Sequence, residues 1–312
     1  MMIEIKRPLI SLCIPTNGVI EWVFPTLDSI YIQNVDETMY EVIVADNGCN
    51  LEFERLIREY ASQHSNLHYY KTNALPFINE IESYKKASGI FIKYLNHRSL
   101  LRKGTLDEYI KFVNMARGRK PVVYFANGVL KGNKKQSRYN SFDHYVRKLS
   151  YFSSWSTGMA FWKEDFDKVD LRHDLSELFP HTKILFNERK RQEYIVDNRK
   201  LLDEQKIGKI SKGKYDLFYA FGVDYLGILT RLVQDGDISI ETFLRVKHEN
   251  LRYMLKMHLD FVVRKLPCSY DISSFRKSMR VYYGCGEIIR EYLGVLLHAG
   301  VNRIYRKVGM HN

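Results

Sequence analysis

Over the first 126 residues, short runs of apolar residues alternate with segments whose apolar residues recur at helical spacing. The strand-like runs are residues 9–14, 41–45, 67–70, 90–95 and 122–126, and the helical segments are residues 22–32, 53–60, 78–87 and 106–116. Strands that alternate with helices predict an α/β fold, in which a mostly parallel sheet carries helices on both faces. Ligands of such sheets bind at the carboxyl ends of the strands, so we expect a site at that edge.

The pattern changes after this region. Residues 127–156 are polar and basic, which predicts a long loop beside the site. Residues 157–162 are apolar enough to form another strand. Residues 175–186 indicate a helix, and Pro180 fits its first turn because proline lacks the N–H that the start of a helix leaves unpaired.

The last third of the chain is helical in pattern and rich in charges. Its segments of helical periodicity are residues 217–234, 240–265 and 275–297. We therefore predict a domain over residues 1–214, divided into residues 1–126 and 127–214, followed by a helical subdomain over residues 215–312.

Composition bounds the class of protein. The chain has 312 residues, of which 45% are hydrophobic, enough for one large domain or two smaller ones. No run of 18 apolar residues occurs, and the polar start does not resemble a signal peptide. The four cysteines show no close paired spacing. We therefore expect a reducing compartment, that is, a cytoplasmic protein, with a peripheral position on the inner face of the membrane as a further option.

The net charge of +12 indicates a surface that attracts anions. Phosphate-bearing ligands, nucleic acid and anionic lipid all satisfy this charge, so charge does not choose among them. No RNA-binding signature of glycine and aromatic residues and no metal knuckle is present, which ranks nucleic acid last as a partner. The 22 tyrosines and 17 phenylalanines suit sugar stacking and membrane interfaces as well as cores.

Five motifs occur in order near the start of the chain. They are residues 10–17 (ISLCIPTN), 27–33 (LDSIYIQ), 41–48 (EVIVADNG), 87–89 (ASG) and 100–106 (LLRKGTL). In this order and spacing they resemble the family 2 glycosyltransferases, whose nucleotide-binding half has the GT-A fold. The resemblance covers residues 8–116, with one departure: the tyrosine of the usual Pro-Thr-Tyr-Asn is absent, and Asn17 follows Thr16 directly.

The resemblance implies that residues 1–126 are the nucleotide-binding half and residues 127–214 the acceptor-side half of the predicted domain. It also implies a nucleotide-sugar pocket lined by the residues that match Pro15, Thr16, Asn17, Asp46 and Asn47. The chemistry agrees, because a carboxylate at the end of the second strand can accept hydrogen bonds from a nucleobase imide or a ribose hydroxyl. The alternative for Asp46 is a structural one, in which it caps the turn that Asn47 and the following glycine form.

The family's metal-binding motif is replaced in this chain. In the family, an Asp-x-Asp motif after the fourth strand holds a divalent metal and the nucleotide diphosphate, whereas this chain has Asn96, His97 and Arg98 there. Asparagine and arginine do not replace hard anionic oxygen ligands, so we expect no metal cofactor. Arg98 can instead pair with phosphate oxygens, assisted by His97 or Lys103. The alternatives are a site that has lost activity, or an Arg98 that points to solvent.

Inverting sugar transfer needs a base that takes the proton of the acceptor hydroxyl. In the family this base is a carboxylate at the start of a helix after the acceptor-side strand. The matching region here contains Asp174, Glu177 and His181, and His181 falls nearest to the usual position by helix register. Its Phe-Pro-His form resembles O-antigen and capsule transferases, including abequosyltransferase-like members. Glu177 and Asp174 remain rivals, and His181 as a helix-start or core histidine is the structural alternative.

Two further regions bear on the acceptor. Trp155 and Gly158 match an aromatic residue and a glycine that border the sugar cleft in the family, although a packing tryptophan fits equally well. The end of the chain is basic and amphipathic around Arg290, Leu297 and Arg303, and it suits an anionic membrane and a lipid-linked acceptor. The alternative is a solvated helix face.

The sequence therefore predicts an inverting glycosyltransferase that moves a sugar from a nucleotide-sugar donor, with UDP-sugar favoured, to a cell-surface glycan such as a polysaccharide, O-antigen or capsule. The alternative prediction is a non-catalytic binding or scaffold subunit of a glycan-assembly complex with the same fold. The donor sugar, the acceptor and the linkage stay open.

Overall fold

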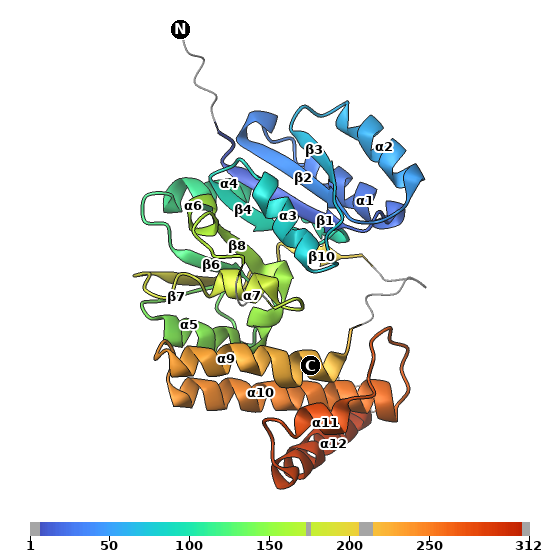
Figure 1. Ribbon diagram of the computed structural model, residues 1–312, viewed down its shortest axis with the longest axis vertical. Helices are drawn as coiled ribbons and strands as arrows, with labels where there is room; N and C mark the ends of the chain where they lie inside the picture. The colour runs from blue at the N-terminus through green and yellow to red at the C-terminus, as the bar shows by residue number, and fades with distance from the viewer. Residues whose placement is uncertain (1–6, 173–175, 206–214, 308–312) are drawn as a thin grey trace. The chain divides into compact units, whose positions relative to one another are not determined.

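The computed structural model describes residues 7–172, 176–205 and 215–307 (Figure 1). The chain divides into two compact units, the first with residues 1–145 and 152–206 and the second with residues 146–151 and 207–312. The predicted domain boundary after residue 214 lies outside the described residues and stays a prediction.

An eight-stranded sheet organises the first unit, in the order β3-β2-β1-β4-β8-β6-β9-β7 (Figure 1). Only β7 and β8 run antiparallel to the other strands of this sheet. The predicted, mostly parallel α/β sheet is therefore confirmed. Its strands are β1 (Ile10–Thr16), β2 (Tyr40–Asp46), β3 (Leu67–Lys71), β4 (Phe91–Tyr94), β6 (Val122–Phe125), β7 (Gln136–Tyr139), β8 (Met159–Trp162) and β9 (Tyr194–Asp197).

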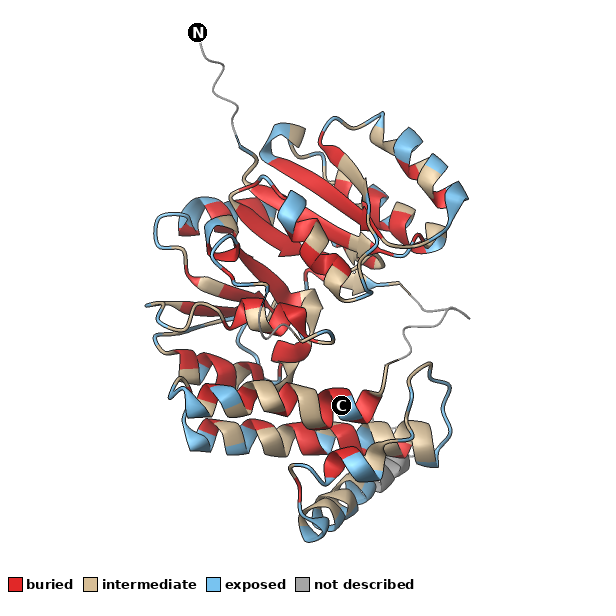
Figure 2. Ribbon diagram, viewed as in Figure 1, coloured by how far each residue is buried: buried red, intermediate tan, exposed pale blue. Residues whose placement is uncertain are grey.

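Side-chain alternation along β1 shows how the helices divide between the two faces of the sheet. Leu12 and Ile14 belong to a buried core that also contains residues of α1, α2 and α4. Cys13 points to the opposite face, where its thiol donates a hydrogen bond to the carbonyl of Ser83 in α3. Figure 2 shows the resulting buried central strands between partly exposed helices. The helices are α1 (Ile20–Tyr31), α2 (Leu51–Ala61), α3 (Ile78–Lys86) and α4 (Thr105–Ala116).

A small second sheet lies beside the end of β4. It pairs β5 (Ser99–Leu101) with β10 (Leu202–Glu204) in antiparallel register, so that Ser99 lies opposite Glu204. Neither strand was predicted, because three residues are too few to show a period. The pairing brings residues from two distant parts of the sequence to the same edge.

The loop predicted over residues 127–156 is wrong. This region contains β7 and the helix α5 (Phe142–Leu149), followed by a 3-10 segment, Ser150–Ser154. The strand was missed because β7 is an edge strand with largely polar residues. The helix was missed because the prediction followed the polar and basic composition of the segment. Its buried positions do have the spacing of an amphipathic helix; they are Phe142, Tyr145, Val146 and Leu149.

The helix predicted over residues 175–186 is shorter in the structure. It is α7 (Pro180–Leu185), and Pro180 occupies its first turn as expected. Helix α6 (Lys163–Phe166) precedes it, directly after β8.

The second unit is helical, as the periodicity predicted. Its helices are α8 (Leu217–Tyr219), α9 (Tyr225–Gln234), α10 (Ile240–His258), α11 (Phe275–Met279) and α12 (Cys285–Lys307), with π-helical turns at Ala220–Asp224 and Leu259–Val263. Ser239 caps α10 by accepting a hydrogen bond from the backbone N–H of Thr242. None of the helices in the described part of the chain has the length and hydropathy needed to cross a membrane.

Candidate functional site

The carboxyl ends of β1, β2 and β4 bring the predicted nucleotide-side residues together. Thr16 ends β1 and pairs in register with Asp46, which ends β2. His97 follows β4, and its Nδ1 lies 2.8 Å from the hydroxyl oxygen of Thr16. Three of the predicted residues therefore meet at the edge where parallel α/β sheets bind ligands.

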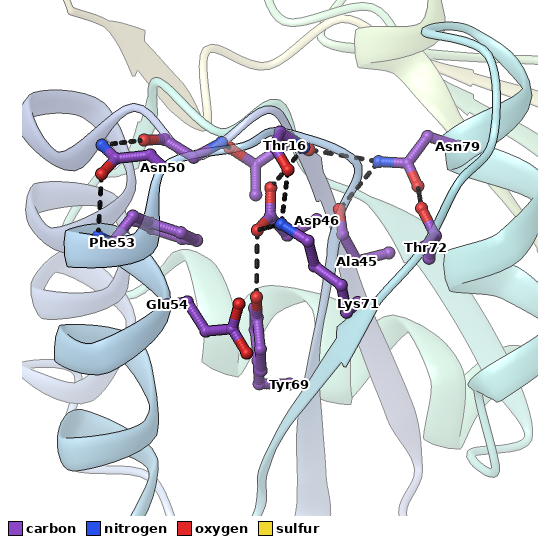
Figure 3. A network of polar contacts seen from close by, with 12 residues as sticks. Thr16, Ala45, Asp46, Asn50, Phe53, Glu54, Tyr69, Lys71, Thr72 and Asn79 are labelled. Atoms are coloured by element: carbon purple, nitrogen blue, oxygen red, sulfur yellow. Dashed lines mark hydrogen bonds and ion pairs between the residues drawn. The ribbon is translucent and has the colours of Figure 1, made fainter.

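Asp46 is fully buried and has three hydrogen-bond donors (Figure 3). Its Oδ1 accepts a bond from the backbone N–H of Gly48 at 2.8 Å, which is the turn-capping role that the sequence left open. Its Oδ2 accepts bonds from the Tyr69 hydroxyl at 3.0 Å and the Lys71 ammonium at 2.9 Å. Asp46 therefore stabilises the turn and positions Tyr69 and Lys71; its contact with a nucleoside stays a prediction.

Asn79 of α3 holds the carboxyl ends of β1 and β2 together (Figure 3). Its amide nitrogen donates to the carbonyl oxygens of Thr16 at 3.2 Å and Ala45 at 2.8 Å, and its amide oxygen accepts a bond from the Thr72 hydroxyl. The role of Asn79 was not predicted, because an asparagine within a helical pattern gives no signal of its own. A fixed amide here holds the backbone of the nucleotide-side edge rigid.

The other predicted nucleotide-side residues are placed by close backbone packing. The Asn47 N–H donates to the carbonyl of Thr16 at 3.0 Å, and Pro15 is half-buried within β1. A Cβ at Gly48 would lie 2.0 Å from the carbonyl oxygen of Asn17, so this position requires glycine. The side chain of Asn17 is exposed at the same edge.

The segment that replaces the Asp-x-Asp motif forms a compact turn. The side-chain oxygen of Asn96 accepts a bond from the Arg98 N–H at 3.2 Å, and the ring of His97 packs edge-on against Trp22 at 5.0 Å. Burial, together with the Arg98 charge, lowers the pKa of His97 to about 4. His97 is therefore neutral at pH 7, and its Nε2 makes no hydrogen bond with the described residues.

Arg98 does not point to solvent. Its guanidinium lies 3.3 Å from the carboxylate of Glu204, which also accepts a bond from the Ser99 hydroxyl at 2.8 Å, and the Arg98 side chain is only 20% exposed. The contact with Glu204 was not predicted, because Glu204 reaches this turn only through the pairing of β10 with β5. Lys103 is exposed nearby in sequence. Among the described residues, no group of at least three His, Cys, Asp or Glu side chains is placed to hold a metal ion.

Residues 152–159, which we call the acceptor-side segment, carry both predicted acceptor residues. The Tyr124 hydroxyl donates to the carbonyls of Phe152 at 2.6 Å and Trp155 at 2.9 Å. A Cβ at Gly158 would lie 2.1 Å from the Tyr124 ring, so glycine is required for this approach. Trp155 is half-buried with its ring 4.8 Å from that of Phe152, and stacking on a sugar stays a prediction.

Helix α7 holds the same segment from another side. The Nε2 of His181 donates to the carbonyl of Ser154 at 2.8 Å, and the Thr182 hydroxyl donates to the carbonyl of Ser153 at 3.2 Å. Backbone carbonyls of an irregular segment need such donors when they are buried. The acceptor-side segment is therefore fixed by side chains from several elements.

Lys93 of β4 is a further support that sequence reasoning missed. Its ammonium group is fully buried and donates to the carbonyls of Tyr94 at 2.6 Å, Thr157 at 2.8 Å and Met159 at 3.3 Å. Burial lowers the pKa of Lys93 to about 7. The only signal in the sequence is a lysine inside the apolar run of residues 90–95.

We expect Lys93→Met to flatten the pH dependence of stability. Because the pKa of Lys93 is lower in the folded chain than the usual value near 10.4, its burial opposes folding fully below pH 7, and this penalty is lost as the pH rises toward 10. The free energy of unfolding of the natural chain should therefore gain about 2 kcal/mol relative to Lys93→Met between pH 7 and pH 9. Denaturant unfolding at both pH values measures the difference, and an unchanged difference would contradict the assignment.

His181, predicted as the base, has both ring nitrogens occupied. Its Nδ1 lies 2.8 Å from the Glu80 carboxylate, and both side chains are buried. Burial alone would lower the pKa of His181, but the adjacent Glu80 carboxylate and the Ser154 carbonyl outweigh it, so the pKa is raised. A buried imidazolium has no lone pair for the acceptor proton, which favours the structural alternative for this histidine.

Of the two other candidate bases, Glu177 and Asp174, only Glu177 lies within the described residues. Glu177 is exposed and makes no hydrogen bond or ion pair with the described residues. Asp174 lies outside the described residues. Glu177 is therefore the available carboxylate of the predicted set just before α7.

Comparison with known proteins identifies the fold. No family model matches the chain, and no curated protein matches its sequence. The structure of S. aureus TarS 1–349 in complex with UDP-GlcNAc is similar, with a TM-score of 0.57 and 16% identity over 92% of this chain and 79% of that one. A longer TarS structure gives a TM-score of 0.51 at 16% identity over 81% of this chain, which spans 44% of that chain's length.

A mannosyltransferase has a similar structure as well. PcManGT from Pyrobaculum calidifontis, in complex with GDP-Man and Mn²⁺, gives a TM-score of 0.50 at 14% identity, over 93% of this chain and 87% of that one. These similarities show that the chain has the GT-A fold, with a mostly parallel sheet flanked by helices and a helical C-terminal part. At this level of identity they establish the fold alone.

Proposed function

We propose that this protein is an inverting glycosyltransferase that moves a sugar from a nucleotide-sugar donor to a cell-surface glycan, such as a polysaccharide, O-antigen or capsule. The observation that carries the proposal is the cluster of Thr16, Asp46 and His97 at the carboxyl edge of a GT-A sheet, in which Thr16 pairs in register with Asp46 and its hydroxyl is hydrogen-bonded to His97. A UDP-sugar is the favoured donor, since the similar TarS structures contain UDP or UDP-GlcNAc, while PcManGT contains GDP-Man.

On the donor side, we propose that Arg98 takes the place of a metal. A guanidinium has five N–H donors, and the pair with Glu204 leaves some of them for phosphate oxygens. The neutral ring of His97 adds a polar nitrogen beside Arg98, and because this ring carries no charge it does not repel the guanidinium. In this proposal the developing charge of the leaving diphosphate is stabilised by Arg98, without a divalent ion.

On the acceptor side, we propose Glu177 as the base and His181 as a positioning residue. The acceptor hydroxyl oxygen attacks the anomeric carbon, the bond from that carbon to the diphosphate oxygen breaks, and the carboxylate takes the hydroxyl proton. The leaving diphosphate keeps the bonding electron pair. Trp155 offers a partly exposed ring at which a sugar can stack.

Nucleotide titration tests this function directly. Calorimetry with UDP, GDP and CMP, each with EDTA and with Mn²⁺, should show binding that does not depend on metal. Arg98→Ala should lower that affinity at least about tenfold, because charge-assisted hydrogen bonds contribute about 1.5–3 kcal/mol. Glu204→Gln should raise the nucleotide affinity, because it removes the carboxylate that competes with the phosphate groups for Arg98.

Arg102→Ala is the matched control. Arg102 also pairs with a carboxylate of β10, that of Asp203 at 3.4 Å, yet it does not belong to the predicted site. Equal losses in Arg98→Ala and Arg102→Ala would contradict a specific role for Arg98. Binding that requires Mn²⁺ would overturn the metal-free proposal while leaving the donor class in place.

The alternative is a non-catalytic binding or scaffold subunit with the same fold. It is favoured by the engaged ring of His181 and by the ion pair that already occupies Arg98. Nucleotide binding without donor turnover, in EDTA and in Mn²⁺, would support this alternative.

We also propose a peripheral contact with an anionic membrane on the cytoplasmic side, which suits a lipid-linked acceptor. On α12, the side chains of Ile289, Leu293 and Leu297 are more than half exposed at helical spacing, next to the exposed Arg290. The side chain of Arg303, which the sequence placed in the same basic surface, lies outside the described residues. Sedimentation with vesicles that contain anionic lipid tests this contact.

A further inference from the structure

A large basic groove lies at the sheet edge opposite the candidate site. Its volume is about 1030 Å³, and its lining residues are Gly118, Arg119, Arg138, Tyr139, Asn140, His144, Lys190, Arg191, Gln192 and Glu193. Arg119 precedes β6, and Lys190 and Arg191 precede β9, so the groove belongs to the amino ends of the parallel strands. The Thr16–Asp46 cluster belongs to their carboxyl ends, which separates the two sites.

The charges in this groove are incompletely balanced. Arg119 and Arg138 share one carboxylate, that of Glu193, which lies 3.6 Å from Arg119 and forms an ion pair with Arg138. Lys190 is exposed and has no carboxylate partner among the described residues. Arg191 is balanced by Asp165 and Glu188 outside the lining. The groove therefore keeps a positive excess.

The lining also offers neutral polar groups. Asn140, Gln192 and the Tyr139 hydroxyl stand among the cations, and His144 is exposed. The groove is much larger than a single phosphate group, and its volume suits a ligand that carries several polar or charged groups. A concave surface of this kind suits a discrete anionic molecule better than a flat bilayer.

We propose that this groove is a second binding site, for an anionic ligand that carries more than one phosphate group. Arginines in a groove pair with phosphate oxygens through parallel N–H bonds, and Lys190 adds a point charge. Glu193 occupies the position between Arg119 and Arg138 that an anionic group of the ligand would take. The ligand displaces that carboxylate from the arginines when it binds.

Calorimetric titration with inorganic tripolyphosphate at physiological ionic strength tests the proposal. The natural chain should bind, and Arg138→Gln and Lys190→Gln should each lower the affinity about tenfold or more. Glu193→Gln should have the opposite effect and raise the affinity, because it removes the competing anion. Thermal unfolding checks that the variants are folded. We expect them to fold, because backbone hydrogen bonds between β7 and β9 hold the part of the groove that contains Arg138.

Two controls separate this groove from other basic surfaces. Lys131→Gln and Arg102→Gln each remove an exposed charge that lies outside the groove and outside the proposed donor site; neither should weaken tripolyphosphate binding. No binding, equal weakening by Lys131→Gln or Arg102→Gln, or loss only in Arg98→Gln would overturn the proposal.

Binding to vesicles that contain anionic phospholipid is the second experiment. If the groove variants weaken vesicle binding alone, the ligand is a membrane surface and the proposal is wrong. The outcome does not depend on glycosyltransferase activity.

Discussion

Glu177→Gln is expected to lower the rate of sugar transfer by about 10²–10⁴-fold, which is the usual contribution of a general base. The amide keeps the size and the hydrogen bonding of the side chain but does not take a proton. Glu177 is exposed and unpaired with the described residues, so the substitution removes no contact that supports the fold. The measurement is release of nucleoside diphosphate from the donor that calorimetry identifies, in the presence of an acceptor glycan.

Two comparisons make this prediction specific. Glu59→Gln removes another exposed carboxylate, near the end of α2, and should leave the rate unchanged, since its ion pair with Arg55 is a surface one. Asp174→Asn tests the rival carboxylate. If Asp174→Asn abolishes transfer while Glu177→Gln retains it, Asp174 is the base and our assignment is wrong. Nucleotide affinity should be unchanged in all three variants, which separates loss of the base from loss of donor binding.

The alternation of strand-like and helical segments predicted the sheet because β1 and β2 are continuous apolar runs that end in polar residues. That same pattern placed Thr16 and Asp46 at one edge, and the structure pairs them in register. Periodicity failed where an element is too short or too polar to show it, as in β5, β10 and β7. In α5 the helical period is present, but the polar and basic composition of the segment favoured a loop.

The candidate site was predictable only where its residues follow strands in sequence. Glu204 joins the site through a pairing of two three-residue strands, and no local pattern announces that contact. The burial of Lys93 and the locking role of Asn79 depend on neighbours from other elements, so a single sequence does not reveal them. The sequence marked His181 as a candidate, but it did not show that Glu80 and Ser154 occupy both of its ring nitrogens, because these contacts depend on tertiary structure.

His181→Ala is expected to lower the free energy of unfolding by about 3–5 kcal/mol, because it leaves the carboxylate of Glu80 buried without its ionic partner. It also removes the donor to the Ser154 carbonyl in the acceptor-side segment. Glu80→Gln should lower the free energy of unfolding by no more than about 1.5 kcal/mol, because a neutral histidine can accept a hydrogen bond from the glutamine amide and still donate one to the Ser154 carbonyl. Denaturant unfolding of both variants measures the difference.

The double variant and the pH dependence identify the cause. Adding Glu80→Gln to His181→Ala should recover part of the lost stability, since no buried charge is then left unpaired. Because the pKa of His181 is raised in the folded chain, its ion pair stabilises fully below pH 6.5 and less as the pH rises through the folded pKa; this dependence should vanish in Glu80→Gln. Additive losses in the double variant would contradict a charged pair.

The same variants separate positioning from proton transfer. If His181 only holds the acceptor-side segment, Glu80→Gln should retain transfer with an unchanged pH profile, because the bond from His181 to Ser154 persists. If His181 were the base, replacing Glu80 would lower the pKa of the imidazole and shift the acidic limb of the rate profile to lower pH. A shifted profile, together with an active Glu177→Gln, would return the base to His181 and require that its ring leave Glu80 when the acceptor binds.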